Sequence, residues 1–170
     1  MKVVPRRCIA DPQLNLYQYT VIDEYSRYRV LGAYAEQNTF SSADLLNKVV
    51  AHFARKGIAV ECVQTDNGFE FTNRFSGSQR NLETHFEATA RQLEIRHKLI
   101  RPNTPRHNGK VERSRREDQK RFYDSHRFYS LVDLGGQLAT HQNRSNSRPM
   151  RPLHWAAPRE VLSSFTVQYV

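Results

Sequence analysis

The stretch RPNTPRHNGKVERSRREDQKRFY, residues 101–123, is the part of the chain from which the fold can best be predicted. It holds eight Lys or Arg residues against three acids, a net charge that is more than half of the chain's +9. Prolines in its first part disfavour a helix there, and the Asn-Gly pair at 108–109 permits a tight turn. No helix breaker follows before Tyr123. We therefore expect a loop that leads into a basic helix, with Glu112 in its first turn.

Glu112 has two interpretations. Acids near the start of a helix stabilise it by about 0.3–1 kcal/mol through the helix dipole, and this explanation needs no function. The alternative is a metal ligand placed where a polyanion docks. From the helix alone, both remain open.

The composition limits the kinds of protein to consider. With 170 residues the chain is long enough for one domain with a real core. Its mean hydropathy of −0.73 and the absence of a long apolar run argue against a membrane protein or a signal peptide. The two cysteines, Cys8 and Cys62, lie far apart, so neither a disulfide framework nor a zinc site is indicated. A pI near 9.9 favours a polyanionic partner, most simply nucleic acid.

The order of the predicted elements indicates an α/β protein. Two segments rich in aromatic and β-branched residues flank a short polar turn and predict a hairpin. Helices and strands alternate after it, so we expect a mixed sheet with helices on its faces. The expected extended segments are 2–5, 17–23, 27–34, 58–63 and 95–100. The expected helices are 41–57, 82–93, 110–123 and 131–142. Ser41-Ser42 is expected to cap the first of these helices, and Gly57 is expected to end it.

The remaining segments are expected to be less regular. Residues 75–81 are polar and predict a loop, and 143–152 is predicted to be a linker rich in Pro, Arg and Ser. A last helical turn is expected within 153–162, where Trp155 would anchor the tail to the core.

Asp66 is the second candidate acid. It follows the predicted strand at 58–63 in the run TDNGFEF, residues 65–71. In α/β folds the carboxyl ends of buried strands carry the chemistry, although Asp-Asn-Gly also forms turns without any further role. Two acids near a basic surface suit a hard divalent cation, which prefers oxygen ligands and keeps positions open for phosphate.

Several motifs together resemble a known family. TDNGFEF at 65–71 and PNTPRHNGKVER at 102–113 are similar to the motifs that carry two acids in the integrase catalytic core of retroviral-type DDE transposases, including bacterial insertion-sequence transposases. VIDEYSRYRV at 21–30 looks like the family's hairpin, and RPMRPLHWAAPREVL at 148–162 resembles its C-terminal signature.

This resemblance implies a ribonuclease-H-like fold and DNA strand cleavage and transfer with two Mg²⁺ or Mn²⁺ ions. Asp66 matches the second acid and Glu112 the third, and both would be catalytic metal ligands. The core would span 1–128, followed by a helical extension and tail at 129–170. The implied partners are transposon-end and target DNA and further copies of the chain, in the bacterial cytoplasm at the nucleoid, with no membrane partner.

The first acid of the family is missing from the expected place. The register would put it immediately before Met1, so we expect an N-terminally trimmed core with a truncated first strand. Asp23 is a poor substitute, since it matches a hairpin aspartate that does not bind metal in the family. The chain also has more residues between Asp66 and Glu112 than the family commonly has.

The basic helix carries the candidate DNA contacts. Arg116, Gln119 and Lys120 share the face of Glu112, while Lys110 and Arg113 lie at the helix start. The family presents basic residues there to DNA phosphates, and the alternative is a solvated charged face.

Three functions remain open. The first is an active transposase or integrase core. The second is an inactive relic that retains only DNA binding or self-association, because one acid is missing. The third is a ribonuclease-H-like nuclease acting on an RNA–DNA hybrid.

Overall fold

The computed structural model describes residues 1–74, 82–101 and 109–167. The chain forms two compact units, a first unit of residues 1–35 and 111–170 and a second unit of residues 36–110. The loops predicted at 75–81 and 102–108 lie outside the described residues. None of the described helices is long and apolar enough to cross a membrane.

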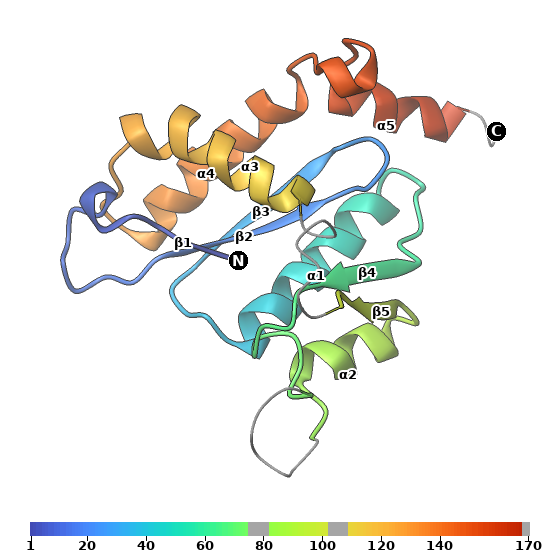
Figure 1. Cartoon of the computed structure of the whole chain (residues 1–170), viewed down its shortest axis with the longest axis horizontal. Helices are drawn as coiled ribbons and strands as arrows, with labels where there is room; N and C mark the ends of the chain where they lie inside the picture. Colours follow the sequence, from blue (N-terminus) through green and yellow to red (C-terminus); the bar gives the residue numbers. More distant parts are fainter. Residues whose placement is uncertain (75–81, 102–108, 168–170) are drawn as a thin grey trace. The chain divides into compact units, whose positions relative to one another are not determined.

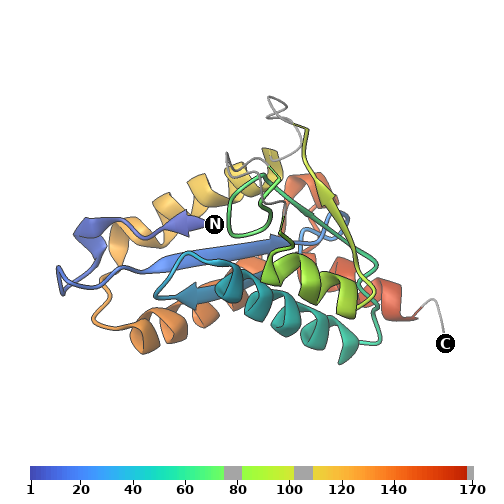
Figure 2. The same ribbon diagram turned by 90° about the horizontal axis from the view of Figure 1, so that it is seen from below.

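The first unit contains a three-stranded antiparallel sheet in the order β1-β2-β3. Strand β1 is Lys2–Val3, β2 is Tyr17–Ile22 and β3 is Arg29–Tyr34. The register pairs Tyr17 with Tyr34 and Ile22 with Arg29, which confirms the predicted hairpin. Figures 1 and 2 show α3, Gly109–Arg121, lying across this sheet.

A hydrophobic core joins the sheet of the first unit to its helices. Phe122, Tyr123 and Phe128, which follow α3, are buried with Leu134 and Leu138 of α4. The other elements of the unit are the 3₁₀ turns η1 (Arg6–Cys8), η3 (Tyr123–Ser125) and η4 (Arg151–Leu153) and the helices α4 (Leu131–Asn146) and α5 (Pro158–Val167).

Helix α4 covers the open edge of β3. The Asn146 side chain accepts a hydrogen bond from the backbone N–H of Arg29 and donates one to its carbonyl, both at 2.9 Å. The Gln142 Oε1 atom accepts from the Leu31 N–H at 2.7 Å. Side-chain amides thus satisfy the strand edge, which would otherwise be open to pairing with another chain.

The domain boundary predicted between 128 and 129 stays a prediction.

The second unit pairs two parallel strands with two helices. Strand β4, Cys62–Thr65, pairs with β5, Arg96–Leu99. Helix α1, Thr39–Ala54, packs against α2, His85–Gln92, and Figure 1 shows both helices beside the strands. Leu46, Phe86, Ala90 and Ile95 form its buried core.

The structure corrects several predicted boundaries. Helix α1 begins after Asn38, whose side chain accepts from the Ser41 N–H, so Ser41-Ser42 lies inside the helix and is not its cap. Gly57, just beyond the helix, has a φ of 71°, as expected for a left-handed terminator. Strand β4 starts at Cys62, four residues later than predicted, and α4 continues to Asn146, into the predicted linker.

The prediction that Trp155 anchors the tail is wrong, because the residue is 70% exposed. Backbone hydrogen bonds hold its turn instead. The Met150 carbonyl accepts from the N–H groups of Leu153 and Trp155, and the Met150 N–H donates to the Ala156 carbonyl. The indole is therefore not needed to fix the tail.

Candidate functional site

Asp66 lies directly after β4, as predicted. The strand pairing ends around it, where the Ile100 N–H donates to the Thr65 carbonyl at 3.0 Å and Asn67 Nδ2 donates to the Ile100 carbonyl at 3.3 Å. Asp66 is half-buried, and its Oδ1 atom accepts from the Gly68 N–H at 3.2 Å. This local turn fixes the carboxylate at the carboxyl end of a parallel strand.

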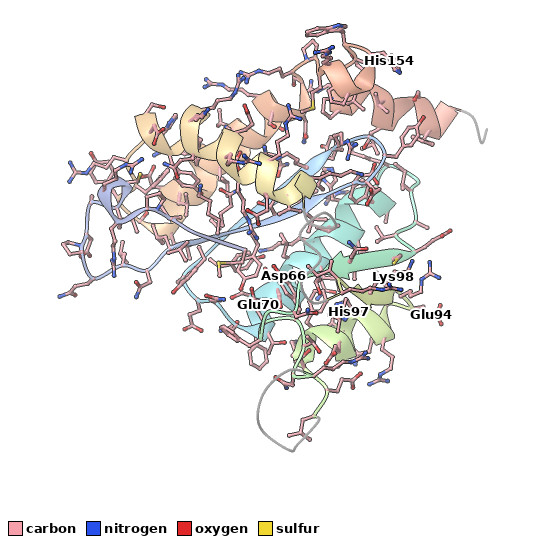
Figure 3. All side chains as sticks on the ribbon, in the orientation of Figure 1. Asp66, Glu70, Glu94, His97, Lys98 and His154 are labelled. Carbon is pink, nitrogen blue, oxygen red and sulfur yellow. The ribbon has the colours of Figure 1, made fainter. Side chains whose placement is uncertain are left out.

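A second carboxylate, Glu70, lies close to Asp66, and Figure 3 shows both on the segment after β4. A Cβ atom added to Gly68 would lie 2.6 Å from Glu70 Oε2 and 3.1 Å from Asp66 Oδ1, so both acids border the same small space. Glu70 is only 3% exposed, and its Oε2 atom accepts from Gln37 Nε2 at 3.3 Å. Its backbone carbonyl accepts from Ser42 Oγ at 2.7 Å.

Sequence reasoning did not single out Glu70. The signal was present in TDNGFEF, where an acid follows Asp66 by four residues across a glycine. The Asn67 Oδ1 atom is also buried and has no hydrogen-bond partner among the described residues. Carboxylate and amide oxygens are the ligand types that Mg²⁺ and Mn²⁺ prefer, so the side-chain oxygens of Asp66, Asn67 and Glu70 are chemically suited to a hard cation.

Substitution of Gly68 tests how closely these carboxylates are packed. Gly68→Ala is expected to displace the buried Glu70 side chain and to lower the free energy of unfolding by about 1–3 kcal/mol. Urea unfolding measures the effect.

Gly136→Ala in α4 is the matched control. A Cβ there meets nothing within 4 Å, and replacing a helical glycine stabilises by about 0.5–1 kcal/mol. Equal effects of the two substitutions would show that the space beside Gly68 is not restricted.

His97 on β5 lies beside the end of β4. Its Nε2 atom is 2.7 Å from the Thr65 hydroxyl, and Phe86 packs edge-on against the imidazole. Burial lowers the pKa of His97 below its ordinary value, which favours a neutral ring at neutral pH. His97 therefore adds no positive charge next to Asp66.

Glu112 lies in the first turn of α3, as predicted. Its Oε1 atom accepts from Arg115 Nη1 at 2.5 Å, and its side chain is half exposed. Asp66 belongs to the second unit and Glu112 to the first. Within the described residues no group of three His, Cys, Asp or Glu side chains is arranged to hold a metal ion.

The basic face of α3 is only partly as predicted. Arg113, Arg116 and Lys120 are exposed and line, with Glu117, a hollow of about 280 Å³. Lys110 is exposed at the helix start. Four of the five predicted contact residues are thus exposed, whereas the fifth, Gln119, is only partly exposed.

That fifth residue, Gln119, makes two hydrogen bonds within the first unit. It accepts from Lys2 Nζ at 3.0 Å and donates to Asp124 Oδ1 at 2.7 Å. Its side chain thus links α3 to β1 and η3.

Asp118 anchors α3 and was also missed by sequence reasoning. Its carboxylate is fully buried and accepts from Arg29 Nη2 at 2.7 and 2.9 Å, from Gln18 Nε2 at 2.8 Å and from His141 Nε2 at 2.9 Å. Burial alone raises the pKa of Asp118, but His141 and the charge of Arg29 together hold it below its ordinary value. The helix that carries Glu112 is thereby tied to β2, β3 and α4.

Asp23 closes the turn of the hairpin. Its Oδ2 atom accepts from the backbone N–H and the hydroxyl of Ser26, at 2.7 and 2.6 Å. The Arg27 N–H donates to its carbonyl at 3.1 Å. These contacts favour the structural role over that of a substitute metal ligand.

Comparison with known proteins shows which family the chain resembles. Residues 1–105 match one family model described as Integrase core domain, and residues 93–158 match a second model of the same description. The protein named Putative integrase ORF3 from Spiroplasma virus SpV1-C74 is 27% identical over 168 residues, which cover 96% of this chain and 46% of that protein. The chain thus spans about half the length of this relative.

Solved structures show the same fold. The catalytic core domain of BIV integrase aligns with a TM-score of 0.65 at 17% identity, over 90% of each chain. A chain of the simian T-cell lymphotropic virus intasome, in complex with PP2A regulatory subunit B56 gamma, aligns with a TM-score of 0.58 at 20% identity, over 78% of this chain and 43% of that one. The predicted mixed α/β fold of the ribonuclease-H-like type is confirmed.

Proposed function

Because the chain belongs to the integrase core domain family, we propose that it is a DNA-cutting and DNA-joining core of the kind used in integration and transposition. The observation that carries this proposal is Asp66, held at the carboxyl end of β4 beside the buried Glu70. The carboxyl end of a parallel strand is where folds of this class place reacting groups.

We assign Asp66 and Glu112 as ligands of Mg²⁺ or Mn²⁺. Divalent ions, when bound in such sites, stabilise charge on the attacking and leaving oxygens of a phosphodiester. The chain's own residues prepare the ligands, because the Gly68 N–H orients Asp66 and α3 carries Glu112 in its first turn. Water, and then a freed DNA 3′-hydroxyl, is the nucleophile, so neither carboxylate forms a bond to DNA.

The DNA contact surface is the exposed basic face of α3. Arg113, Arg116 and Lys120 border one hollow and attract phosphates, with Lys110 at the helix start. Gln119 contributes by holding Lys2 and Asp124, so its effect on DNA is indirect. Joining two DNA ends requires two active sites, and we propose that several copies of the chain assemble on DNA.

Salt dependence of duplex binding tests this surface. Arg116→Ala and Lys120→Ala are each expected to weaken binding and to lower the slope of log affinity against log salt by about 1, because each removes one phosphate contact. Fluorescence anisotropy of a labelled duplex measures both quantities.

Arg91→Ala in α2 is the matched control. Arg91 pairs with Glu83 at 3.1 Å, and neither residue lines the hollow, so its loss is expected to leave the slope nearly unchanged. A flat salt dependence of the unmodified chain would contradict DNA binding through α3.

A further inference from the structure

Two consecutive residues after η4, His154 and Trp155, adopt left-handed backbone conformations. Their φ angles are 52° and 65°, in a region of backbone conformation that residues other than glycine rarely occupy. Strain of this kind persists only where the surrounding structure imposes it, and it is frequent at binding sites. The turn therefore needs a physical explanation beyond chain reversal.

Backbone hydrogen bonds impose the strained conformation. The Trp155 N–H donates to the Met150 carbonyl at 3.0 Å, and the Met150 N–H donates to the Ala156 carbonyl at 3.1 Å. Glu160 in the first turn of α5, Pro158–Val167, also holds this segment, since its Oε2 atom accepts from the Ala157 N–H at 2.7 Å. The backbone that carries the indole is thus fixed before any ligand binds.

The indole itself is presented to solvent. Trp155 is 70% exposed, and the neighbouring Met150 is 39% exposed. Figure 3 shows His154 at this turn. A large aromatic ring on a rigid backbone binds a flat partner with little loss of conformational entropy.

The charge around the turn selects a polyanion. Residues 144–160 contain four arginines and one acid, and that acid, Glu160, is engaged by the backbone of Ala157. All four arginines are exposed: Arg144, Arg148, Arg151 and Arg159. An apolar protein surface would match the indole alone and an acidic one the arginines alone, whereas a nucleic acid matches both the ring and the cations.

We propose that Trp155 stacks on an unpaired DNA base while the surrounding arginines hold the adjoining phosphates. The base must be unpaired because a base inside a duplex has no open face, whereas stacking on an aromatic side chain accepts any base. This inference rests on the proposed function, since a frayed or single-stranded end is a substrate feature of a DNA-joining core. It adds a second DNA contact, separate from the basic face of α3.

The chain offers a direct spectroscopic test, because Trp155 is its only tryptophan. Tryptophan fluorescence is measured while a duplex with a short single-stranded overhang is added, and a blunt duplex of the same sequence is added in parallel. Strong quenching by the overhang and weak quenching by the blunt duplex are expected.

Glycine substitutions separate stacking from folding. Trp155→Gly is expected to weaken overhang binding about tenfold or more and blunt-duplex binding less than about twofold, measured by anisotropy of labelled DNA. His154→Gly relieves the same kind of backbone strain without removing the indole and should bind as the unmodified chain does. Both variants are expected to melt at an equal or higher temperature, since glycine adopts a left-handed φ without strain. Trp155→Phe keeps a ring and should restore most of the overhang affinity.

Each other outcome has a distinct meaning. Equal binding and equal quenching by both DNAs would overturn the stacking inference and leave the proposed function standing. Absence of binding to either DNA would overturn both. A change of fluorescence with chain concentration alone, and none with DNA, would show that the indole contacts a second copy and would also overturn the inference.

Discussion

Asp118→Asn is expected to lower the free energy of unfolding by about 3–5 kcal/mol, because it leaves the buried Arg29 guanidinium without its countercharge. The Asp118 carboxylate is 0% exposed and also holds Gln18 and His141. Urea unfolding followed by far-ultraviolet circular dichroism measures the change.

A matched control lies one residue away. Glu117 is paired with Arg121 on the solvent side of α3, where ion pairs contribute about 0–1 kcal/mol. Glu117→Gln should therefore change stability by less than about 1 kcal/mol. A similarly small effect of Asp118→Asn would mean that the network around Asp118 does not hold α3 in place.

The Asp118 carboxylate is also expected to make the free energy of unfolding fall as the pH is lowered. The pKa of Asp118 in the folded chain lies below its ordinary value, so the unfolded chain takes up this proton first as the pH falls. The stability that Asp118 contributes is complete above the ordinary carboxyl pKa of about 3.9 and is lost below it. The Asp118→Asn variant should consequently lose less stability than the unmodified chain between neutral pH and about pH 3.

Asp66→Asn and Glu112→Gln are each expected to reduce DNA nicking by about 10³-fold or more, because residues that act as one catalytic unit fail almost completely when a single member is removed. Each change keeps the size of the side chain and removes its charge. The assay uses a duplex with a transposon-type end and Mn²⁺, and it counts nicked strands on a denaturing gel.

Glu83→Gln serves as the control, since it removes an exposed carboxylate that pairs with Arg91 and lies outside both the proposed ligands and the hollow on α3. Nicking that survives both Asp66→Asn and Glu112→Gln would rule out the assigned site. Tight DNA binding without any nicking by the unmodified chain would instead support the inactive DNA-binding relic considered from the sequence.

The elements that the sequence predicted well are those with a strong local signal. The hairpin at β2 and β3 has alternating β-branched and aromatic residues, and α3 has an uninterrupted run of helix formers after Gly109. Asp66 was placed correctly because a short apolar run leads directly into its turn. Local chemistry decides these features, so neighbouring residues were enough.

The features that were missed depend on contacts between distant residues. Asp118 looked like another acid on a charged helix, yet it is buried by Gln18, Arg29 and His141 from three other elements. Ser114 and Phe122 lie four residues before and after Asp118 and are also buried. Residues four apart share one face of a helix, so this spacing could have indicated that Asp118 lies on the buried face.

Trp155 was misjudged for the opposite reason. Large aromatic residues are usually buried, and only the backbone hydrogen bonds of its turn explain why this one is not. Glu70 was overlooked because its relation to Asp66 depends on the turn through Gly68.

Our central proposal is that Asp66 and Glu112 are ligands of the same divalent cation. Electron paramagnetic resonance of Mn²⁺, titrated into the unmodified chain, both single variants and the double variant, tests it most directly. If the two carboxylates share an ion, each single substitution weakens binding about tenfold or more, and the double substitution weakens it little further. Losses that multiply in the double variant, or single variants that bind Mn²⁺ as the unmodified chain does, would contradict a shared site.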